Sequence, residues 1–571
     1  MNPFDHTKFI GYVCDVNPQF VRIQIPSAKL VNSFYLNGNI FMGASVGSYV
    51  IIEGNNIGFL GKIFELNLPL GERKELTEKD FTEGNPFFHP MGKVELLAIF
   101  DHYKPLSITK TASKFPIVGA KVFSCSAEQM GQYISSFGKK EEDETAPIAP
   151  FGELTSNNSV CSLSINSLFR RHCAVLGTTG GGKSWTVAKL VELISKYTAN
   201  KCIVIDATGE YRTLDQYGSS ISMGKGDYYY DYRNLTIDEL YFLLHPSSKT
   251  QVPKLMEAIR SLKMISLDEK NFLANYYEQD VSGKVIKNNL IKAARHKRAF
   301  QEFYYKNIVN IEDNSCNFEF TSLPHQITQE CVWDSGVAGH WGNRNDNDVA
   351  NCISLISRVN NIMSTSEYND IFGFRKNQTE NSTDLRVIIE EFLNNDSQKS
   401  LLRIDFSQVS FDYQVREILV NSIGQYLLNQ ARKGRFKETP IVVFMDEAHQ
   451  FLNKKISDEY FSSKPLDAFE KISKEARKYG LFLCIATQMP RDIPIGTLSQ
   501  IGTFIVHRLI NEQDKRAVEA AVSAANNSSL AFLPILGEGE ALLAGVDFPM
   551  PLTLKIYPPK YKPNSGTPKL K

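Results

Sequence analysis

Several features that would assign this chain to a specialised class of protein are missing from its sequence. No apolar run approaches the roughly 18 consecutive residues that a membrane-spanning helix needs, and residues 1–6 lack the basic-then-apolar layout of a secretory signal. The nine cysteines include no C-x-x-C pair, and no histidines stand at zinc-ligand spacing, which favours reduced thiols over disulfides or structural zinc. The sequence therefore predicts a cytoplasmic protein without a membrane anchor.

Net charge is also lacking, because 63 lysines and arginines balance 63 aspartates and glutamates. Any contact with nucleic acid must therefore come from a local basic surface, such as the wall of a channel. The length of 571 residues exceeds one ordinary domain and corresponds to about three. With 42% apolar and 22% charged residues, the composition is that of a folded globular protein.

A glycine-rich stretch gives the strongest positive signal. It consists of Gly177, Thr178, Thr179, Gly180, Gly181, Gly182, Lys183 and Ser184. The apolar run Ala174–Leu176 precedes it, and a segment with helical spacing, Val187–Val191, follows. This is the context of a phosphate-binding loop, in which backbone N–H groups and a helix N-terminus surround phosphate oxygens. We expect Lys183 to reach the outer phosphates, Ser184 to ligate Mg²⁺, and Trp185, the next residue, to border the nucleotide.

The second half of such a site lies far downstream. The apolar run Ile441–Met445 has the length and composition of a strand buried on both faces, and it ends in Asp446 and Glu447. An acid at the tip of such a strand holds Mg²⁺, and an adjacent glutamate can orient and deprotonate the attacking water. Asp446 is thus the predicted Mg²⁺ ligand, and Glu447 the predicted catalytic base for hydrolysis of a nucleoside triphosphate.

The chain divides into segments of different pattern. Short alternating strands separated by Gly, Asn and Pro predict a small β-barrel at the N-terminus, whereas strands alternating with helices later predict a parallel sheet covered on both faces. The boundaries that we expect are 1–138 for the barrel, 139–150 for a charged linker, 151–234 and 386–557 for the two parts of the core, 235–385 for a helical insertion, and 558–571 for a C-terminal tail.

Within the insertion, two stretches need an interpretation. Leu290–Arg298 has a composition that we take as helical. The overlapping stretch Lys292–Lys306 is basic and either lines a path for nucleic acid or is a solvated helix face, the more common fate of a charge run.

Further motifs accompany the two halves of the site. They are Arg171-His172, Asp206–Tyr211, Asp446–His449, Glu475–Gly480, Ala486–Pro490, Leu498–Thr503 and Gly537–Leu542. In order and in neighbouring residues, this set resembles the HerA family of hexameric DNA translocases, relatives of FtsK. One departure is Gly181, where the family loop often has Ser. The resemblance implies an α/β fold with a RecA-like P-loop ATPase core and an N-terminal barrel of the kind that this family carries. It is weak over the helical insertion, which is expected from the sequence pattern.

The resemblance also implies an assembly and roles for particular residues. It implies a homo-hexameric ring with ATP and Mg²⁺ at each interface and double-stranded DNA through the centre. Gln488 would sense the γ-phosphate, and Arg477 would reach the ATP of a neighbour. Arg171 is a second candidate for a phosphate or interface contact, and Lys555 and Ile556 would border the adenine.

Simpler interpretations stay open for several of these residues. Arg477 stands among lysines on an amphipathic segment and could be a plain surface arginine. Gln488 could bond backbone groups at a strand end. Asp206 either positions its loop or takes part in the chemistry.

Two functions are compatible with the resemblance. One is a DNA-translocating motor that works with a partner effector, such as a NurA-like nuclease, a sirtuin-type NADase or another nuclease. The other is an ATP-responsive scaffold that assembles and activates such an effector in an anti-phage defence system, with little processive movement. A conjugative coupling ATPase is disfavoured, because those proteins usually carry membrane anchors.

Overall fold

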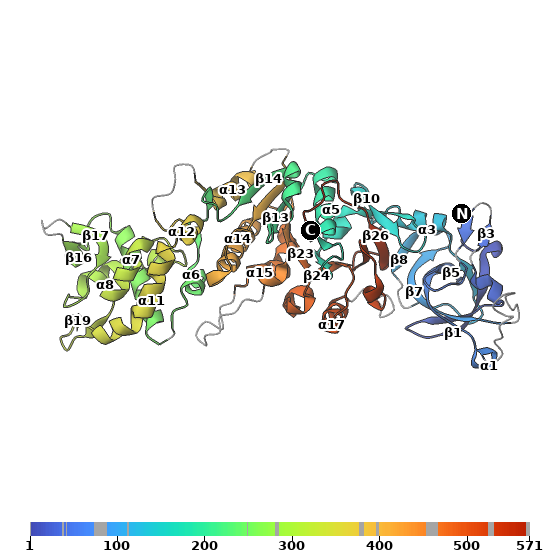
Figure 1. Cartoon of the computed structure of the whole chain (residues 1–571), viewed down its shortest axis with the longest axis horizontal. Coiled ribbons are helices and arrows are strands. Elements are labelled where there is room, and N and C mark those ends of the chain that lie inside the picture. Colours follow the sequence, from blue (N-terminus) through green and yellow to red (C-terminus); the bar gives the residue numbers. More distant parts are fainter. Residues whose placement is uncertain are drawn as a thin grey trace, which may run out of the picture. The chain divides into compact units, whose positions relative to one another are not determined.

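The computed structural model describes most of the chain as two compact units (Figure 1). The first unit contains residues 1–202, 439–447 and 482–571, and the second contains residues 203–438 and 448–481. The described residues are 2–32, 34–36, 39–41, 43–73, 88–110, 114–247, 249–279, 285–375, 382–394, 399–452, 466–522 and 530–566. Within these ranges, none of the helices combines the length and the apolar character that crossing a bilayer requires.

The N-terminal part of the first unit is a closed antiparallel β-barrel. Its strands are β1 (Phe9–Val16), β2 (Val21–Gln24), β7 (Met91–Asp101), β6 (Ile57–Asn67), β5 (Tyr49–Glu53) and β9 (Lys121–Ser124). The barrel closes because β2 pairs with β7 as well as with β1, while β8 (Lys104–Lys110) extends the sheet beyond β7. Alternate residues such as Val21 and Ile23 point inward and are fully buried. The predicted barrel is confirmed.

A second, mixed sheet forms the rest of the first unit. Its order is β11-β10-β26-β25-β24-β12-β23-β22. The strands are β10 (Ile148–Leu154), β11 (Val160–Ser164), β12 (His172–Leu176), β22 (Ile441–Met445), β23 (Leu481–Thr487), β24 (Ile501–Val506), β25 (Glu540–Gly545) and β26 (Leu552–Ile556). The predicted parallel pairing holds where β12 meets β23 and β24. Beyond β24 the pairing is antiparallel, and a short turn joins β25 to β26.

The helix α5 (Lys183–Tyr197) follows β12 after the glycine-rich loop. Every residue of β12 is buried, and α5 buries an apolar face that includes Val187, Leu190 and Val191. Each such side chain contributes about 1.5–3 kcal/mol when it leaves water. The loop is therefore held between a strand and a helix that are both fixed by the core.

The second unit contains three neighbouring sheet strands and the helices that accompany them. The sheet order is β13 (Lys201–Asp206), β21 (Leu401–Asp405) and β14 (Gly218–Ser222), with β14 and β21 parallel. Two further helices of this unit, α14 (Val415–Arg432) and α15 (Ala468–Glu475), pack against each other.

The insertion is a mostly helical region of the second unit. Its helices are α6 (Ile237–Leu244), α7 (Gln251–Leu267), α8 (Arg298–Lys306), α9 (Ile308–Ile311), α10 (Leu323–Gln329), α11 (Asp346–Ser364) and α12 (Ser366–Phe372), with α13 (Leu385–Asn394) directly after it. Two small antiparallel sheets lie among them: β16 (Tyr277–Gln279) with β17 (Val285–Leu290), and β18 (Val332–Asp334) with β19 (Trp341–Arg344). A parallel pair, β15 (Tyr228–Tyr229) and β20 (Thr383–Asp384), joins the segments where the chain enters and leaves the insertion.

One prediction within the insertion is wrong. Residues 290–298 are not helical: Leu290 ends β17, and α8 begins only at Arg298. Between them, Ala294 has a φ of 55°, in the left-handed region that a continuing right-handed helix excludes.

Candidate active site

The glycine-rich loop has the backbone geometry of a phosphate cradle. Gly180 and Gly182 have φ angles of 73° and 109°, which side-chain-bearing residues rarely adopt. Gly177 has a φ of 154°, and a Cβ on it would lie 2.6 Å from the Cβ of His507. A Cβ on Gly182 would lie 3.2 Å from the Cα of Gly539. The glycines therefore supply both the turn and the close approach of neighbouring backbone.

The first turn of α5 carries the two residues predicted to bind phosphate and Mg²⁺. Lys183 is buried, and its Nζ donates to the backbone oxygen of Thr178 at 3.4 Å, so that the ammonium lies over the loop. Ser184 follows and is half-buried. The helix N-terminus and the ammonium bring positive charge to the same place, which suits an anionic ligand.

The predicted acids lie at the end of β22. Asp446 and Glu447 have only 5% and 8% of their surface exposed, directly after a strand in which every residue is buried. Glu447 has a φ of 44°, a left-handed conformation that costs a residue with a side chain about 1–3 kcal/mol. Such strain persists where neighbouring contacts hold the residue, and it redirects the carboxylate away from the direction of the strand.

Gln488 connects these acids with the phosphate loop. Its Nε2 donates to Oε1 of Glu447 at 2.5 Å, and its Oε1 accepts a hydrogen bond from the hydroxyl of Thr179. We call Thr179, Gln488 and Glu447 the catalytic relay, because hydrogen bonds run from the loop through the end of β23 to the end of β22. The structure thus brings together predicted residues that are up to 309 positions apart in sequence.

His507 is a residue of the site that the sequence analysis assigned no role. It follows the fully buried strand β24, and its ring lies under the loop. Its Nδ1 donates to the backbone oxygen of Glu540 at 2.9 Å, and its Nε2 accepts from the hydroxyl of Thr186 in α5 at 2.9 Å. Burial lowers the pKa of His507 to about 4, so the imidazole is neutral and fits this donor–acceptor pattern. The sequence signal that could have indicated His507 is a polar residue directly after the apolar strand β24, which pairs in parallel with β12.

The end of β26 also reaches the loop. The N–H of Gly539 donates to the oxygen of Gly181 at 3.3 Å, and the N–H of Ile556 donates to the oxygen of Gly539 at 3.0 Å. Lys555 is exposed and lies opposite Glu540 in the β25–β26 register. Ile556 is thus placed beside the loop, and the contact of Lys555 and Ile556 with adenine stays a prediction.

Trp185 is next to the loop on the exposed side of α5. It is 37% exposed, and the Nζ of Lys562 lies 5.2 Å from the centroid of its ring. The backbone N–H of Lys560 donates to Glu192 in the same helix at 2.8 Å. The segment after β26 therefore runs along α5, and a contact of Trp185 with the nucleotide also stays a prediction.

Arg171 lies at the other end of β12 from the loop. Its Nε is 3.4 Å from Oδ2 of Asp547, and a Cβ on Gly502 would lie 2.3 Å from its Cδ. Gly177 is six residue steps along extended chain from Arg171, a span of about 20 Å. Arg171 is therefore remote from the loop of its own chain.

The remaining two candidates belong to the second unit. Asp206 is fully buried, accepts the N–H groups of Gly209 and Tyr211 at 2.8 and 3.1 Å, and is 3.1 Å from Nη1 of Arg403. Burial raises the pKa of Asp206, although these donors favour its carboxylate form. These contacts support the role of positioning its loop. Arg477 is exposed in a short 3-10 helix, residues 476–479.

Comparisons with known proteins agree with this geometry. The family model for the central domain of helicase HerA matches residues 149–329, and that for the helicase HerA-like C-terminal domain matches residues 430–554. A probable helicase of Methanocaldococcus jannaschii is 22% identical over 528 residues, which cover 90% of this chain and 86% of that protein. The DNA double-strand break repair helicase HerA of Saccharolobus solfataricus is 22% identical over 522 residues, covering 90% and 87%.

Among solved structures, VirB4 of Thermoanaerobacter pseudethanolicus matches with a TM-score of 0.44 and 12% identity, covering 73% of this chain and 98% of that one. The two family models together match more than half of the residues, and both halves of the nucleotide site lie within them. With its phosphate loop, strand-end acids and mixed core sheet, the chain belongs to the HerA helicase family of P-loop ATPases.

Proposed function

We propose that this ATPase is a motor that moves double-stranded DNA through a ring of six subunits. The observation that carries the proposal is the catalytic relay, which ties the phosphate loop to the general base through Gln488. A γ-phosphate bound over the loop would compete for the same hydrogen bonds, so binding and hydrolysis would change the contacts of Gln488. The relatives named as DNA repair helicases support DNA as the substrate on which this change acts.

The donor set at the site fits Mg²⁺. The hydroxyl of Ser184 and the carboxylate of Asp446 are oxygen ligands, which Mg²⁺ prefers together with phosphate oxygens and water. Bound there, Mg²⁺ with ATP would supply neutralisation of the charge that develops on the phosphates. The two residues would hold it at the edge of the sheet, next to the ammonium of Lys183.

The protein groups would divide the remaining work. Lys183 would bind the outer phosphates, and Glu447 would accept a proton from the attacking water. Gln488 would orient Glu447 and the γ-phosphate relative to each other. His507, neutral and hydrogen-bonded on both sides, would keep the loop and α5 in register.

We propose that Arg477 acts on the nucleotide of a neighbouring subunit. Its exposure leaves the guanidinium accessible, and a fixed delocalised charge suits a phosphoryl group in transit. Arg171, remote from its own loop, is a further candidate for an interface contact.

Arg477→Ala tests the shared site directly. We expect turnover to fall about 10³-fold or more while native mass spectrometry still finds six subunits. Lys478→Ala, the same truncation at the next exposed cation, is the matched control. Normal turnover in Arg477→Ala would remove this residue from the site, and a fully active monomer would overturn the ring.

DNA dependence tests the motor. The ATPase rate is measured with and without duplex DNA at moderate salt, and displacement of a third strand from a triplex reports translocation. Stimulation with displacement is expected. An ATPase that is indifferent to DNA would contradict the proposal.

A second candidate function is a scaffold that assembles a defence effector, such as a nuclease or a sirtuin-type NADase. The observation that favours it is the insertion, which has its own apolar core around Met264, Leu273 and Leu290. A purified effector that stimulates the ATPase more than DNA does would select this function. All nine cysteines are free thiols, which under either function supports the cytoplasm as the location.

A further inference from the structure

A two-stranded hairpin with a segment hydrogen-bonded to it lies at the surface of the insertion. The hairpin is β18–β19, with Val332 opposite Arg344. Residues 294–297 run beside this hairpin, and three backbone hydrogen bonds join them to it: Ala294 N–H to Gly342 O at 2.9 Å, Trp341 N–H to Arg295 O at 3.0 Å, and Lys297 N–H to Gly339 O at 2.7 Å. We call residues 294–298 with β18 and β19 the basic ribbon.

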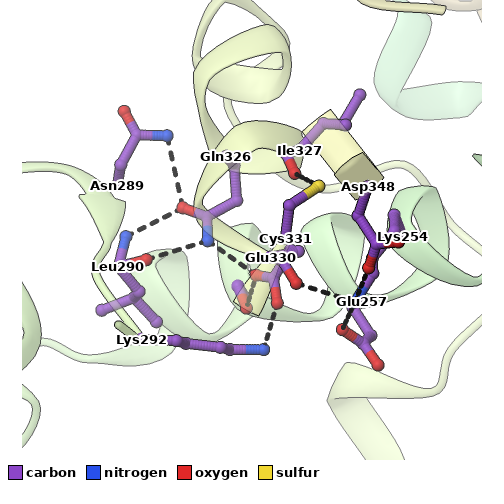
Figure 2. A network of polar contacts seen from close by, with 11 residues as sticks. Lys254, Glu257, Asn289, Leu290, Lys292, Gln326, Ile327, Glu330, Cys331 and Asp348 are labelled. Atoms are coloured by element: carbon purple, nitrogen blue, oxygen red, sulfur yellow. Dashed lines mark hydrogen bonds and ion pairs between the residues drawn. The ribbon is translucent and has the colours of Figure 1, made fainter. Parts of the chain in front are cut away.

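A buried network fixes the ribbon from inside. Lys292 is only 5% exposed, and Figure 2 shows its ammonium directed at the carboxylate of Glu330, with which it forms an ion pair. Ser261 and Gln326 donate to the other oxygen of Glu330 at 2.6 and 2.7 Å. We call Lys292, Glu330, Gln326 and Ser261 the insertion network. Lys292, the first residue of the basic stretch 292–306, therefore neither lines a path nor faces solvent, whereas Arg295 and Arg298 in the same stretch are exposed.

Lys292 also connects the network to the ribbon. Its Nζ lies 4.6 Å from the ring centroid of Phe300 and 5.4 Å from that of Trp341, a residue of β19. The hydroxyl of Tyr276 donates to the backbone oxygen of His296 at 2.5 Å. The segment is thus held at Lys292 by its side chain and at His296 by its backbone oxygen.

The displayed side chains are mainly cationic. Arg295, His296 and Arg298 are exposed, and within the described ranges neither arginine belongs to an ion pair. Lys297 and Arg344 face carboxylates at 4.0 and 3.0 Å, from Asp334 and Asp346 respectively. The neighbouring Trp333 is 51% exposed.

We propose that the basic ribbon binds the phosphodiester backbone of DNA outside the nucleotide site. Arginine forks match phosphate oxygens bidentately, and no carboxylate of the described residues pairs with Arg295 or Arg298. The exposed ion pairs of Lys297 and Arg344 contribute little on their own, so phosphates can replace their partners at small cost. An exposed tryptophan beside cations also offers a stacking face for an unpaired base.

This proposal rests on the proposed function, since it adds a second DNA contact to the same motor. The chain has no net charge, so a local surface of this kind is what contact with DNA requires. An acidic protein is the competing occupant. The ribbon favours DNA because it carries exposed arginines and an exposed tryptophan ring.

The test uses the full chain and Arg295→Ala/Arg298→Ala. Affinity for a labelled duplex is measured by fluorescence anisotropy over a series of salt concentrations. Loss of two phosphate contacts should lower the magnitude of the slope of log K against log salt by about 2 and weaken binding about 10-fold to 60-fold at ~0.1 M salt. ATP hydrolysis without DNA and thermal unfolding should match the unmodified protein. Lys433→Ala/Lys437→Ala, two exposed lysines after α14, is the matched control.

The outcomes separate the two proposals. If the unmodified protein binds no DNA at any salt concentration, the DNA motor and the ribbon both fail. If it binds DNA and the double variant keeps its salt slope, the ribbon alone is wrong. If the double variant loses only an acidic protein partner, DNA is the wrong occupant. Trp333→Ala distinguishes single-stranded from double-stranded DNA as the ligand. If this variant loses affinity only for a labelled oligothymidine, the ribbon binds single-stranded DNA. If its affinity is unchanged while the arginine variant binds more weakly, the ribbon binds the duplex backbone.

Discussion

The catalytic relay and the insertion network are both chains of polar side chains that join distant segments, but they differ in burial and in strain. The relay includes an exposed Thr179 and a Glu447 in a left-handed conformation. The insertion network contains Glu330 with none of its surface exposed, and it satisfies both oxygens of that carboxylate. A network that contacts a ligand keeps some of its groups exposed, whereas a network that only holds a surface in place is fully buried. Replacement of the relay should therefore cost turnover, and replacement of the sealed network should cost stability.

Glu447→Gln should have the largest effect and should act on turnover alone. Loss of the general base lowers the rate of ATP hydrolysis about 10²-fold to 10⁴-fold, while ATP stays bound. Steady-state hydrolysis and retention of labelled ATP after gel filtration are the measurements. The amide is nearly isosteric, so the melting temperature should stay the same. Normal turnover would refute the assignment of Glu447 as the base.

Glu330→Ala should act on stability rather than on turnover. Removal of Glu330 leaves the ammonium of Lys292 buried without its ion-pair partner, which costs about 3–5 kcal/mol of stability. Lys292→Met/Glu330→Leu removes both charges and should recover most of that loss. Urea unfolding followed by tryptophan fluorescence measures both variants, since Trp341 contacts Lys292. Equal destabilisation by the single and double variants would show that charge burial is not the cause.

The stability of the region around His507, next to the phosphate loop, should depend on pH. The pKa of His507 is about 4 in the folded chain against about 6.5 when unfolded, so only the unfolded chain takes up the proton as the pH falls. Its contribution to stability is complete above about pH 6.5 and falls by about 3 kcal/mol as the pH approaches 4. His507→Gln should remove this dependence. The difference in unfolding free energy between the two proteins, measured from pH 7 to 4, isolates the residue, and a constant difference would contradict the assignment.

Thr179→Val should have the smallest effect on the relay. It removes the donor that holds Oε1 of Gln488 and keeps the shape of the side chain, so we expect kcat to fall a few-fold with little change in KM. Thr179→Ser keeps the hydroxyl and should restore kcat. An equal loss in both variants would mean that the methyl group, rather than the hydrogen bond, matters.

The parts of the site that could be predicted are those with a local signature. The glycines, Lys183 and Ser184 form one contiguous loop, and Asp446 with Glu447 directly follows an apolar strand. His507 and Gly539 could not be predicted in the same way, because their roles depend on strands paired across the fold. The same limit explains Lys292: its charge indicated solvent, and only the positions of Glu330, Phe300 and Trp341 show that it is buried.

The two-stranded pairing of β15 with β20 brings together the points where the chain departs for the insertion and comes back. The insertion is also held at α6, where Asn421 of α14 donates a hydrogen bond to Glu239, so the part beyond α6 can change in length without moving these two strands. The part of the insertion beyond α6 is therefore a module whose base is held by the rest of the second unit. Related ATPases could diversify what they recognise by replacing this module while their hydrolytic machinery stays unchanged.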